Sequence, residues 1–235
     1  MNLIDKILVK KRIWMRRLQG QEFNPELDAT FSTKRYGPDF GGWELIPEEV
    51  TADSIVYSFG VGEEISFDLD LIADRGVTIH AFDPTPKSLE WLKSQEVPKE
   101  FIMHPLGIAS YDGEAQFNAP DNPDFVSHTM LSIESCANGS VAVPVKRLAT
   151  IMKELGHDHI DILKIDIEGA EYDVIDDILK TDDRPRYFFV EFHHRFPEVG
   201  LKPSKRAIRQ LRQAGYELFA VSSTKEEFCF RLKSS

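Results

Sequence analysis

The stretch DILKIDIEGAEYDVIDDIL, residues 161–179, decides the fold class of this chain. It joins a short apolar run, which predicts a buried strand over 159–166, to a segment over 168–180 that has the apolar spacing of a helix. Asp166 and Glu168 stand at that joint, where burying a charge is unfavourable unless the charge has a partner. The acids at the joint therefore mark a candidate functional site.

The same strand-to-helix rhythm repeats on both sides of this stretch. Strands are predicted at 54–60, 77–83, 100–109 and 185–194, and helices at 63–74, 85–94, 145–156 and 203–215. The last two extended runs, 216–223 and 226–232, predict a hairpin, whereas 119–146 has the polar composition of an irregular segment. This alternation predicts an α/β fold with a mostly parallel sheet and helices on both faces. Ligands bind beyond the carboxyl ends of such strands, so Asp166 is expected on the functional rim.

Composition limits the kind of partner. The chain has 235 residues, which suits a single α/β domain, and its net charge of -11 argues against a nucleic-acid groove across the main body. It has two cysteines, no apolar run of about 20 residues and no signal-peptide pattern, so we expect a cytoplasmic protein. The sequence leaves the oligomeric state open.

The N-terminal arm differs from the rest of the chain. Residues 1–20 carry six basic residues against one acidic residue, and apolar residues recur there at helical spacing. We expect residues 1–50 to form a basic amphipathic helix and a loop-rich cap, ahead of a main domain over 51–235. The helix either packs on the acidic body of the protein or, through residues 1–18, contacts the inner membrane surface or an acidic partner.

The first predicted strand-to-helix loop suggests a nucleoside cofactor. SFGVGEEIS, residues 58–66, places Gly60 and Gly62 as in the dinucleotide pattern G-x-G-x-x-G, with Ile65 where the third glycine belongs. Asp83 ends the second strand, near the spacing expected of a carboxylate that binds ribose hydroxyls. NAD and S-adenosylmethionine both present a ribose to such an acid.

The charge of the loop distinguishes between the two candidate cofactors. A pyrophosphate at this loop would meet Glu63 and Glu64, whereas S-adenosylmethionine has no phosphate and carries a sulfonium and an ammonium group. The incomplete glycine pattern favours the same choice. We therefore predict S-adenosylmethionine as the methyl donor, with S-adenosylhomocysteine as its product.

Four segments together resemble the FkbM-type S-adenosylmethionine-dependent methyltransferases, with LKIDIEGAE as the signature of that family. The segments are VYSFGVGEEISFD (56–68), HAFDPTP (80–86), LKIDIEGAE (163–171) and FFVEFHH (188–194). The resemblance implies a Rossmann-like class I methyltransferase fold with a seven-stranded sheet and an antiparallel last strand. It also implies O-methylation of hydroxyls on sugars and polyketide-type natural products.

The resemblance implies a cofactor site, position by position. Many members have Asp before the first glycine where this chain has Ser58-Phe59, so Glu64 or Ser66 is expected to bind the methionine amino group instead. The other expected contacts are Gly60 and Gly62 at the methionine part, Asp83 and Pro84 at the ribose, and Gly107, Ile108 and Ala109 at the adenine.

Catalysis is expected where two neighbouring strands end. Asp166 and Glu168 follow one strand, and His193 and His194 end the next. A histidine with a pKa near neutrality is the better general base, and a carboxylate can orient it or bind a sugar hydroxyl. Each histidine can instead serve only to bond backbone at the strand end, and Lys164 can form a buried ion pair with one of the acids.

A divalent cation is the alternative use of the same groups. Asp166, Glu191 and His193 offer two oxygens and a nitrogen, which suit Mn²⁺ or Mg²⁺. They lack a tight ligand spacing in the sequence, and a sugar hydroxyl can lose its proton without metal. We therefore predict catalysis without a metal.

The acceptor site is the least defined part. Besides Glu191, the candidates are Trp43, whose ring can stack on a sugar or anchor the core, and Ser127, His128 and Thr129 in the irregular segment. We predict an S-adenosylmethionine-dependent O-methyltransferase acting on a sugar or glycan hydroxyl, on a nucleotide-sugar, a polysaccharide or a lipid-linked acceptor. The alternatives are methylation of a polyketide or other natural product, an NAD-linked oxidoreductase, and a non-catalytic cofactor-binding protein.

Overall fold

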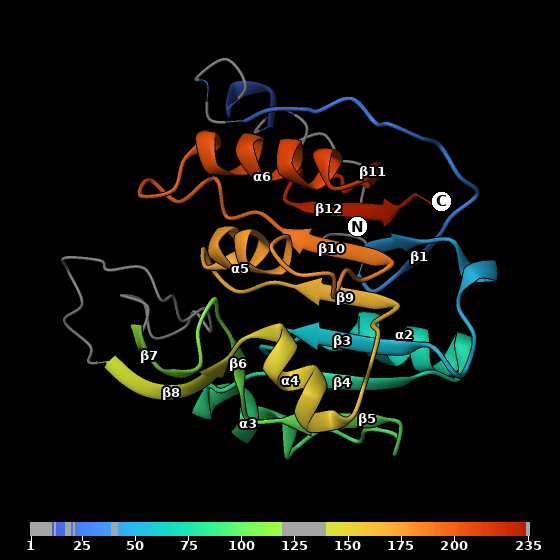
Figure 1. The fold of residues 1–235 in the computed structure, drawn as a ribbon, viewed down its shortest axis with the longest axis vertical. Helices are drawn as coiled ribbons and strands as arrows, with labels where there is room; N and C mark the ends of the chain where they lie inside the picture. Colours follow the sequence, from blue (N-terminus) through green and yellow to red (C-terminus); the bar gives the residue numbers. More distant parts are fainter. Residues whose placement is uncertain are drawn as a thin grey trace.

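The computed structural model describes residues 22–38, 42–118 and 140–233, together with residues 11, 13–16 and 20. Its main sheet has seven strands in the order β11-β12-β10-β9-β3-β4-β5 (Figure 1). These strands are β3 Ile55–Phe59, β4 Thr78–Phe82, β5 Phe101–His104, β9 Ile162–Ile165, β10 Tyr187–Glu191, β11 Tyr216–Val221 and β12 Glu227–Leu232. Only β12 runs against its neighbours, β10 and β11, in this sheet. The predicted parallel sheet with a C-terminal antiparallel hairpin is confirmed.

Helices cover both faces of the sheet. Successive side chains of each strand point to opposite faces, so both faces are apolar and must be buried. The helices are α2 Ser66–Arg75, α3 Pro86–Leu92, α4 Leu148–Leu155, α5 Glu171–Ile178 and α6 Leu201–Gln213. Phe188 and Val190 of β10 pack in the core that α4, α5 and α6 complete, whereas Tyr187 and Phe189 pack in the core that contains α2. This period of two is the expected pattern for a strand buried on both sides.

The segment before β3 forms a small antiparallel pair and a short 3-10 helix. The pair is β1 Lys34–Tyr36 with β2 Trp43–Leu45, and the 3-10 helix is η1 Pro47–Glu49. β1 contacts α2 and β2 contacts β12, so this cap lies on the α2 face of the sheet. The loop-rich cap expected before the main domain therefore packs into one of its two cores.

A second small sheet corrects one sequence expectation. β6 Gly107–Ile108, β7 Gly113–Asn118 and β8 Ser140–Lys146 form three strands beyond the arrow tips of β3 and β9 (Figure 1). The segment expected to be irregular therefore ends in a strand. β8 contains Pro144, which disfavours a central strand, but pairing with β7 and burial of Val143 and Val145 outweigh that penalty.

Most of the N-terminal arm lies outside the described residues. Within it, residues 13–16 are helical, and Trp14 and Met15 have exposed fractions of 58% and 43%. Over the part of the chain that the structure describes, no helix has the length and apolar character needed to cross a bilayer.

The strand order reverses between β3 and β9. From β3 the chain adds β4 and β5 on one side, and β9 and β10 lie on the other. Loops on the two sides of such a reversal diverge, so a crevice opens at the carboxyl ends of these strands. Gly60, Asp83 and Asp166 each follow directly after a strand that ends there.

Candidate functional site

A pocket of about 240 Å³ lies at the carboxyl ends of β3, β4, β9 and β10. Its polar wall comes from residues 60–64 after β3, 83–85 after β4 and 166–168 after β9, with Glu191 at the end of β10. Four separate segments of the sequence therefore meet at the strand-order reversal, which is where the alternation of strands and helices predicted a ligand site.

Asp83 is the buried carboxylate on one side of this pocket. One oxygen accepts a hydrogen bond from the backbone N–H of Gly62 at 2.9 Å. The other accepts from the backbone N–H and the hydroxyl of Thr85 at 2.8 Å and 2.6 Å. The carboxylate thus holds the loop after β3 against the loop after β4, while its side chain still lines the pocket. This is a rigid acceptor, already oriented before any ligand binds.

Most of the predicted cofactor residues reach the pocket. Gly60, Gly62, Glu64, Asp83, Pro84, Gly107 and Ile108 line it. Two do not: Ala109 is buried in the core of the small sheet, and Ser66 lies inside the start of α2. The backbone N–H of Ser66 donates to the Glu64 carboxylate at 2.7 Å, so Glu64 also satisfies the helix terminus. Ala109 and Ser66 are therefore not among the residues that line this pocket, in contrast to the other predicted cofactor contacts.

Three carboxylates form an acidic edge on the opposite side of the pocket, and His193 lies behind them. Asp166, Glu168 and Glu191 line the pocket, and the His193 side chain is 7% exposed. Its Nε2 lies 3.6 Å from Asp166, 3.3 Å from Glu168 and 4.0 Å from Glu191. Its Nδ1 lies 3.4 Å from the carboxylate of Glu171, which is fully buried. The structure therefore brings together the acids and one of the two histidines predicted from the strand ends.

Burial and the neighbouring acids shift the pKa values of Glu191 and His193. Burial raises the pKa of Glu191 well above its ordinary value, and the charge of Asp166 raises it further. Burial alone would lower the pKa of His193, but Glu171, Asp166 and Glu168 together hold it well above the ordinary value. The neighbouring carboxylates thus favour the protonated form of His193, which has no lone pair to act as a general base. The surroundings of His193 therefore oppose the near-neutral pKa expected of a histidine base and favour a carboxylate in that role, and the identity of the base stays a prediction.

The backbone of Glu168 is held in an unusual conformation. Its φ is +53°, in the left-handed region that a residue with a Cβ rarely adopts. Gly169, with φ +101°, follows at once, and its N–H donates to Glu171 at 2.8 Å. The chain turns sharply between β9 and α5, and this turn directs the Glu168 side chain into the pocket. Such strain is typical of functional positions, where surrounding structure compensates for it.

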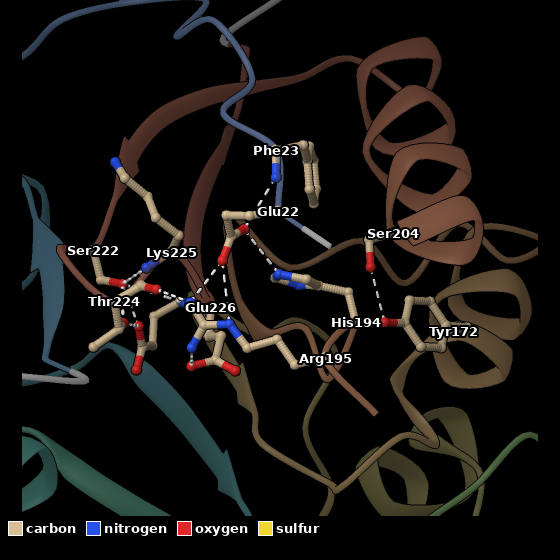
Figure 2. A network of polar contacts seen from close by, with 11 residues as sticks. Glu22, Phe23, Tyr172, His194, Arg195, Ser204, Ser222, Thr224, Lys225 and Glu226 are labelled. Atoms are coloured by element: carbon tan, nitrogen blue, oxygen red, sulfur yellow. Dashed lines mark hydrogen bonds and ion pairs between the residues drawn. The ribbon is translucent and has the colours of Figure 1, made fainter. Parts of the chain in front are cut away.

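His194 does not reach the site that its neighbour occupies. Its Nε2 lies 2.9 Å from the carboxylate of Glu22, and both side chains are fully buried (Figure 2). The same carboxylate accepts from Arg195, which also contacts Glu226 and the carbonyl of Thr224. The prediction that both histidines share one site is wrong for His194: both residues follow the end of β10 at Glu191, and the backbone there directs His194 to Glu22.

Lys164 and Trp43 lie under the pocket. The Lys164 Nζ donates to the carbonyl of Gly60 at 3.4 Å and sits 5.9 Å from the centre of the Trp43 ring. It lines the pocket without the predicted ion pair to Asp166 or Glu191. Trp43 also lines the pocket, but it is 2% exposed and stacks on Phe189 at 5.7 Å. Its main role is therefore that of a core anchor which closes one wall of the pocket.

The acceptor contacts expected in the irregular segment stay predictions. Ser127, His128 and Thr129 lie outside the described residues. Phe59 and Phe82 line the pocket although the sequence analysis did not select them, and their rings stack at 4.3 Å. Each is the last residue of a strand, directly before Gly60 and Asp83, and that position is the signal that could have identified them.

Comparisons with known proteins assign the chain to a family. The Methyltransferase FkbM domain family matches residues 55–218. The "Probable methyltransferase-like protein 24" of Homo sapiens is 25% identical over 175 residues, 70% of this chain and 41% of that protein. The Rattus norvegicus protein of that name is 24% identical over 175 residues, 70% of this chain and 42% of that protein. The chain thus spans about two fifths of the length of these curated relatives.

A solved structure is also similar. The crystal structure of Methyltransferase FkbM from Methylobacillus flagellatus KT matches with a TM-score of 0.46 and 12% identity, over 77% of this chain and 44% of that chain. The family match extends from β3 into β11, and so contains the whole polar wall of the pocket. On that match, this chain belongs to the FkbM methyltransferase family.

Proposed function

We propose that this protein transfers a methyl group from S-adenosylmethionine to a hydroxyl of a sugar or glycan. The observation that carries the proposal is one pocket with two different polar ends. A single buried carboxylate, Asp83, stands at one end, and the acidic edge of Asp166, Glu168 and Glu191 stands at the other. Such a pocket suits a nucleoside ribose at the first end and a hydroxylated acceptor at the second.

Charge supports this methyl donor over a dinucleotide. The pocket is lined by six carboxylates (Glu63, Glu64, Asp83, Asp166, Glu168 and Glu191) and one lysine. Lys164 is the one basic side chain in this lining, and its Nζ donates to the Gly60 carbonyl at 3.4 Å. A sulfonium and an ammonium group are attracted by this lining, whereas two phosphates are repelled.

Each residue of the acidic edge has its own role toward the acceptor. A bound S-adenosylmethionine would supply a methyl group on a positively charged sulfur, which the acceptor oxygen attacks in line as the carbon–sulfur bond breaks. Asp166 and Glu191 hold the acceptor hydroxyls, and Glu168 accepts the proton that leaves the attacking oxygen. His193 positions Glu168 and Asp166 from behind. The products are a methyl ether, S-adenosylhomocysteine and a protonated Glu168.

The proposal of a sugar acceptor is based on the same acidic edge. Several carboxylates side by side can accept hydrogen bonds from adjacent hydroxyls, which a sugar presents and a simple alcohol does not. Phe117 of β7 and Trp43 add apolar surface to the lining of the same pocket. A ring with one apolar face and several hydroxyls matches this combination.

Two measurements test the proposal on the full chain. Titration calorimetry should show binding of S-adenosylhomocysteine and none of NAD; the reverse result would overturn the choice of cofactor. Incubation with methyl-labelled S-adenosylmethionine and a panel of nucleotide-sugars and oligosaccharides should then give a labelled methyl ether. Labelling confined to amine acceptors, with every hydroxyl acceptor unlabelled, would overturn the transfer to oxygen.

A further inference from the structure

We propose that Asp166, Glu191 and His193 bind a divalent cation of the Mn²⁺ or Mg²⁺ class, which holds the acceptor hydroxyl in the pocket. One ligand atom from each of the three residues lies within 4.8 Å of the other two. The Nε2 of His193 is 3.6 Å from Asp166 Oδ1 and 4.0 Å from Glu191 Oε1. Neighbouring oxygen ligands at about 2.1 Å from Mg²⁺ stand about 3 Å apart in an octahedron. Small rotations of these side chains therefore close the site around an ion.

The second observation concerns the buried imidazole itself. His193 is 6% exposed, its Nδ1 makes no hydrogen bond of normal geometry, and its Nε2 points among the acids. Behind the ring, Glu171 accepts hydrogen bonds from the N–H groups of Gly169 at 2.8 Å and His193 at 2.9 Å. A histidine that binds metal usually directs its other ring N–H to such a fixed carboxylate. In the metal-bound state the cation takes the place of the proton on Nε2, which is released to solvent, and the proton on Nδ1 faces Glu171.

The charges around the site favour a bound cation. Asp166, Glu171 and Glu191 all lie around His193, and across the described ranges the ion pairs of these three acids are with that histidine alone. The nearest lysine in the pocket, Lys164, is directed to the Gly60 carbonyl instead. Carboxylates gathered this closely repel one another, and a divalent ion between two of them removes that repulsion.

The donor set indicates which ions fit. Two carboxylate oxygens and one imidazole nitrogen suit Mn²⁺ and Mg²⁺ rather than the thiolate-bound ions. Three protein ligands leave further octahedral positions open toward the pocket for water or an acceptor oxygen. Resting on the proposed function, the cation would lower the pKa of the bound hydroxyl, and Glu168 would remain as the carboxylate that takes its proton.

The test uses the full chain, freed of metal with EDTA and then titrated with MnCl₂. Calorimetry, with electron paramagnetic resonance to count free Mn²⁺, should show one bound ion per chain. Asp166→Asn and Glu191→Gln should each raise the Kd for Mn²⁺ by tenfold or more, and Glu171→Gln by about 10–100-fold. Asp173→Asn, which removes one exposed charge from α5 outside the pocket, is the matched control and should leave the Kd unchanged.

The outcomes separate this site from the proposed function. No Mn²⁺ binding at millimolar concentration, or equal Kd values in all four variants, would overturn the site. Circular dichroism and S-adenosylhomocysteine binding in EDTA show whether each variant is folded. If Asp166→Asn does not fold, Glu191→Gln still tests the site, because it removes a charge and keeps the shape of the side chain. Full methyl transfer in EDTA would overturn the role of the cation but not the transferase. Mn²⁺ binding without S-adenosylhomocysteine binding would support the site and overturn the proposed function.

Discussion

The backbone of Gly60 lies directly against the carbonyl of Asp166. A Cβ on Gly60 would stand 1.7 Å from that carbonyl oxygen, and Gly60 has a φ of +81°. The hydrogen bond from the Asp166 N–H to the carbonyl of Phe59, at 3.1 Å, fixes the two segments side by side. The loop after β3 and the acidic edge are therefore joined through close backbone contacts, and only glycine fits at position 60.

This contact predicts unequal effects at two glycines of the same loop. Gly60→Ala should lower the free energy of unfolding by about 3 kcal/mol or more, because the left-handed backbone and the clash both disfavour Ala. Gly62 also has a positive φ, +55°, but its Cβ would meet nothing within 4 Å. Gly62→Ala should therefore cost only about 1–2 kcal/mol in denaturant unfolding. Equal losses in the two variants would contradict the importance of the Asp166 contact.

Asp83→Asn should weaken binding of S-adenosylhomocysteine by about 1–3 kcal/mol, because the ribose and the N–H groups of Gly62 and Thr85 lose a charged acceptor. The measurement is titration calorimetry, with Asp173→Asn as a control of equal charge change. An unchanged Kd in Asp83→Asn would mean that the ribose lies elsewhere.

Glu168 should show opposite effects on rate and stability. Glu168→Gln should lower kcat by about 10²–10⁴-fold, because the proton acceptor is lost, while the Kd for S-adenosylhomocysteine stays unchanged. Glu168→Gly should lower kcat as much, yet raise the free energy of unfolding by about 1 kcal/mol, since glycine adopts a φ of +53° without strain. Steady-state kinetics and denaturant unfolding measure the two effects. An active Glu168→Gly variant would show that the strained turn does not serve catalysis.

A histidine cluster away from the pocket predicts acid sensitivity. Burial, with help from the neighbouring His104 and His157, lowers the pKa of His80 to about 4, and its Nδ1 lies 3.0 Å from the His104 Nε2. The folded protein then binds fewer protons than the unfolded chain, so stability is present above the unfolded pKa near 6.5 and is lost as pH falls toward 4. The loss should reach about 3 kcal/mol.

Thermal unfolding between pH 7 and pH 4 measures this loss. His80→Gln should flatten the dependence on pH over that window, because the group that titrates has been removed. His159→Gln changes an exposed histidine that bonds Asp158 and should leave the dependence in place. A slope unaltered by His80→Gln would assign the acid sensitivity to other groups.

The N-terminal segment should divide into a dispensable arm and a structural anchor. Removing residues 1–18 should keep both stability and cofactor binding, because the contacts of the anchor begin at Glu22. Glu22→Gln should lower the free energy of unfolding by about 3 kcal/mol, since it leaves Arg195 and His194 without their buried carboxylate (Figure 2). Denaturant unfolding compares the two proteins, with Glu26→Gln as the surface control.

The same truncation tests the membrane proposal for the arm. If the basic helix binds anionic lipid, full-length protein should sediment with phosphatidylserine vesicles at low salt, and the protein lacking residues 1–18 should not. Equal sedimentation of the two proteins would show that the arm is not responsible. If the full-length protein does not bind such vesicles, the arm instead packs on the acidic body of the protein.

The sequence by itself determined the architecture and the location of the site. Apolar runs that end at Gly60, Asp83 and Asp166 predicted the strands, because burial on both faces of a parallel sheet requires continuous apolar residues. The order of strands and helices then required those three ends to lie on one rim. This inference needed only local periodicity and the general geometry of βαβ units.

The tertiary structure alone decided which side chains meet. His193 and His194 are adjacent, and only the packing of β10 between β9 and β12 determines that the first faces the acids and the second faces Glu22. Lys164, placed equally well for an ion pair, is turned toward the Gly60 carbonyl by the approach of the β3 loop. Glu171, which looks like a surface charge of a helix, becomes the buried partner of His193. Such contacts join residues distant in sequence, so local propensity carries no information about them, and they are selected only when the whole sheet has formed.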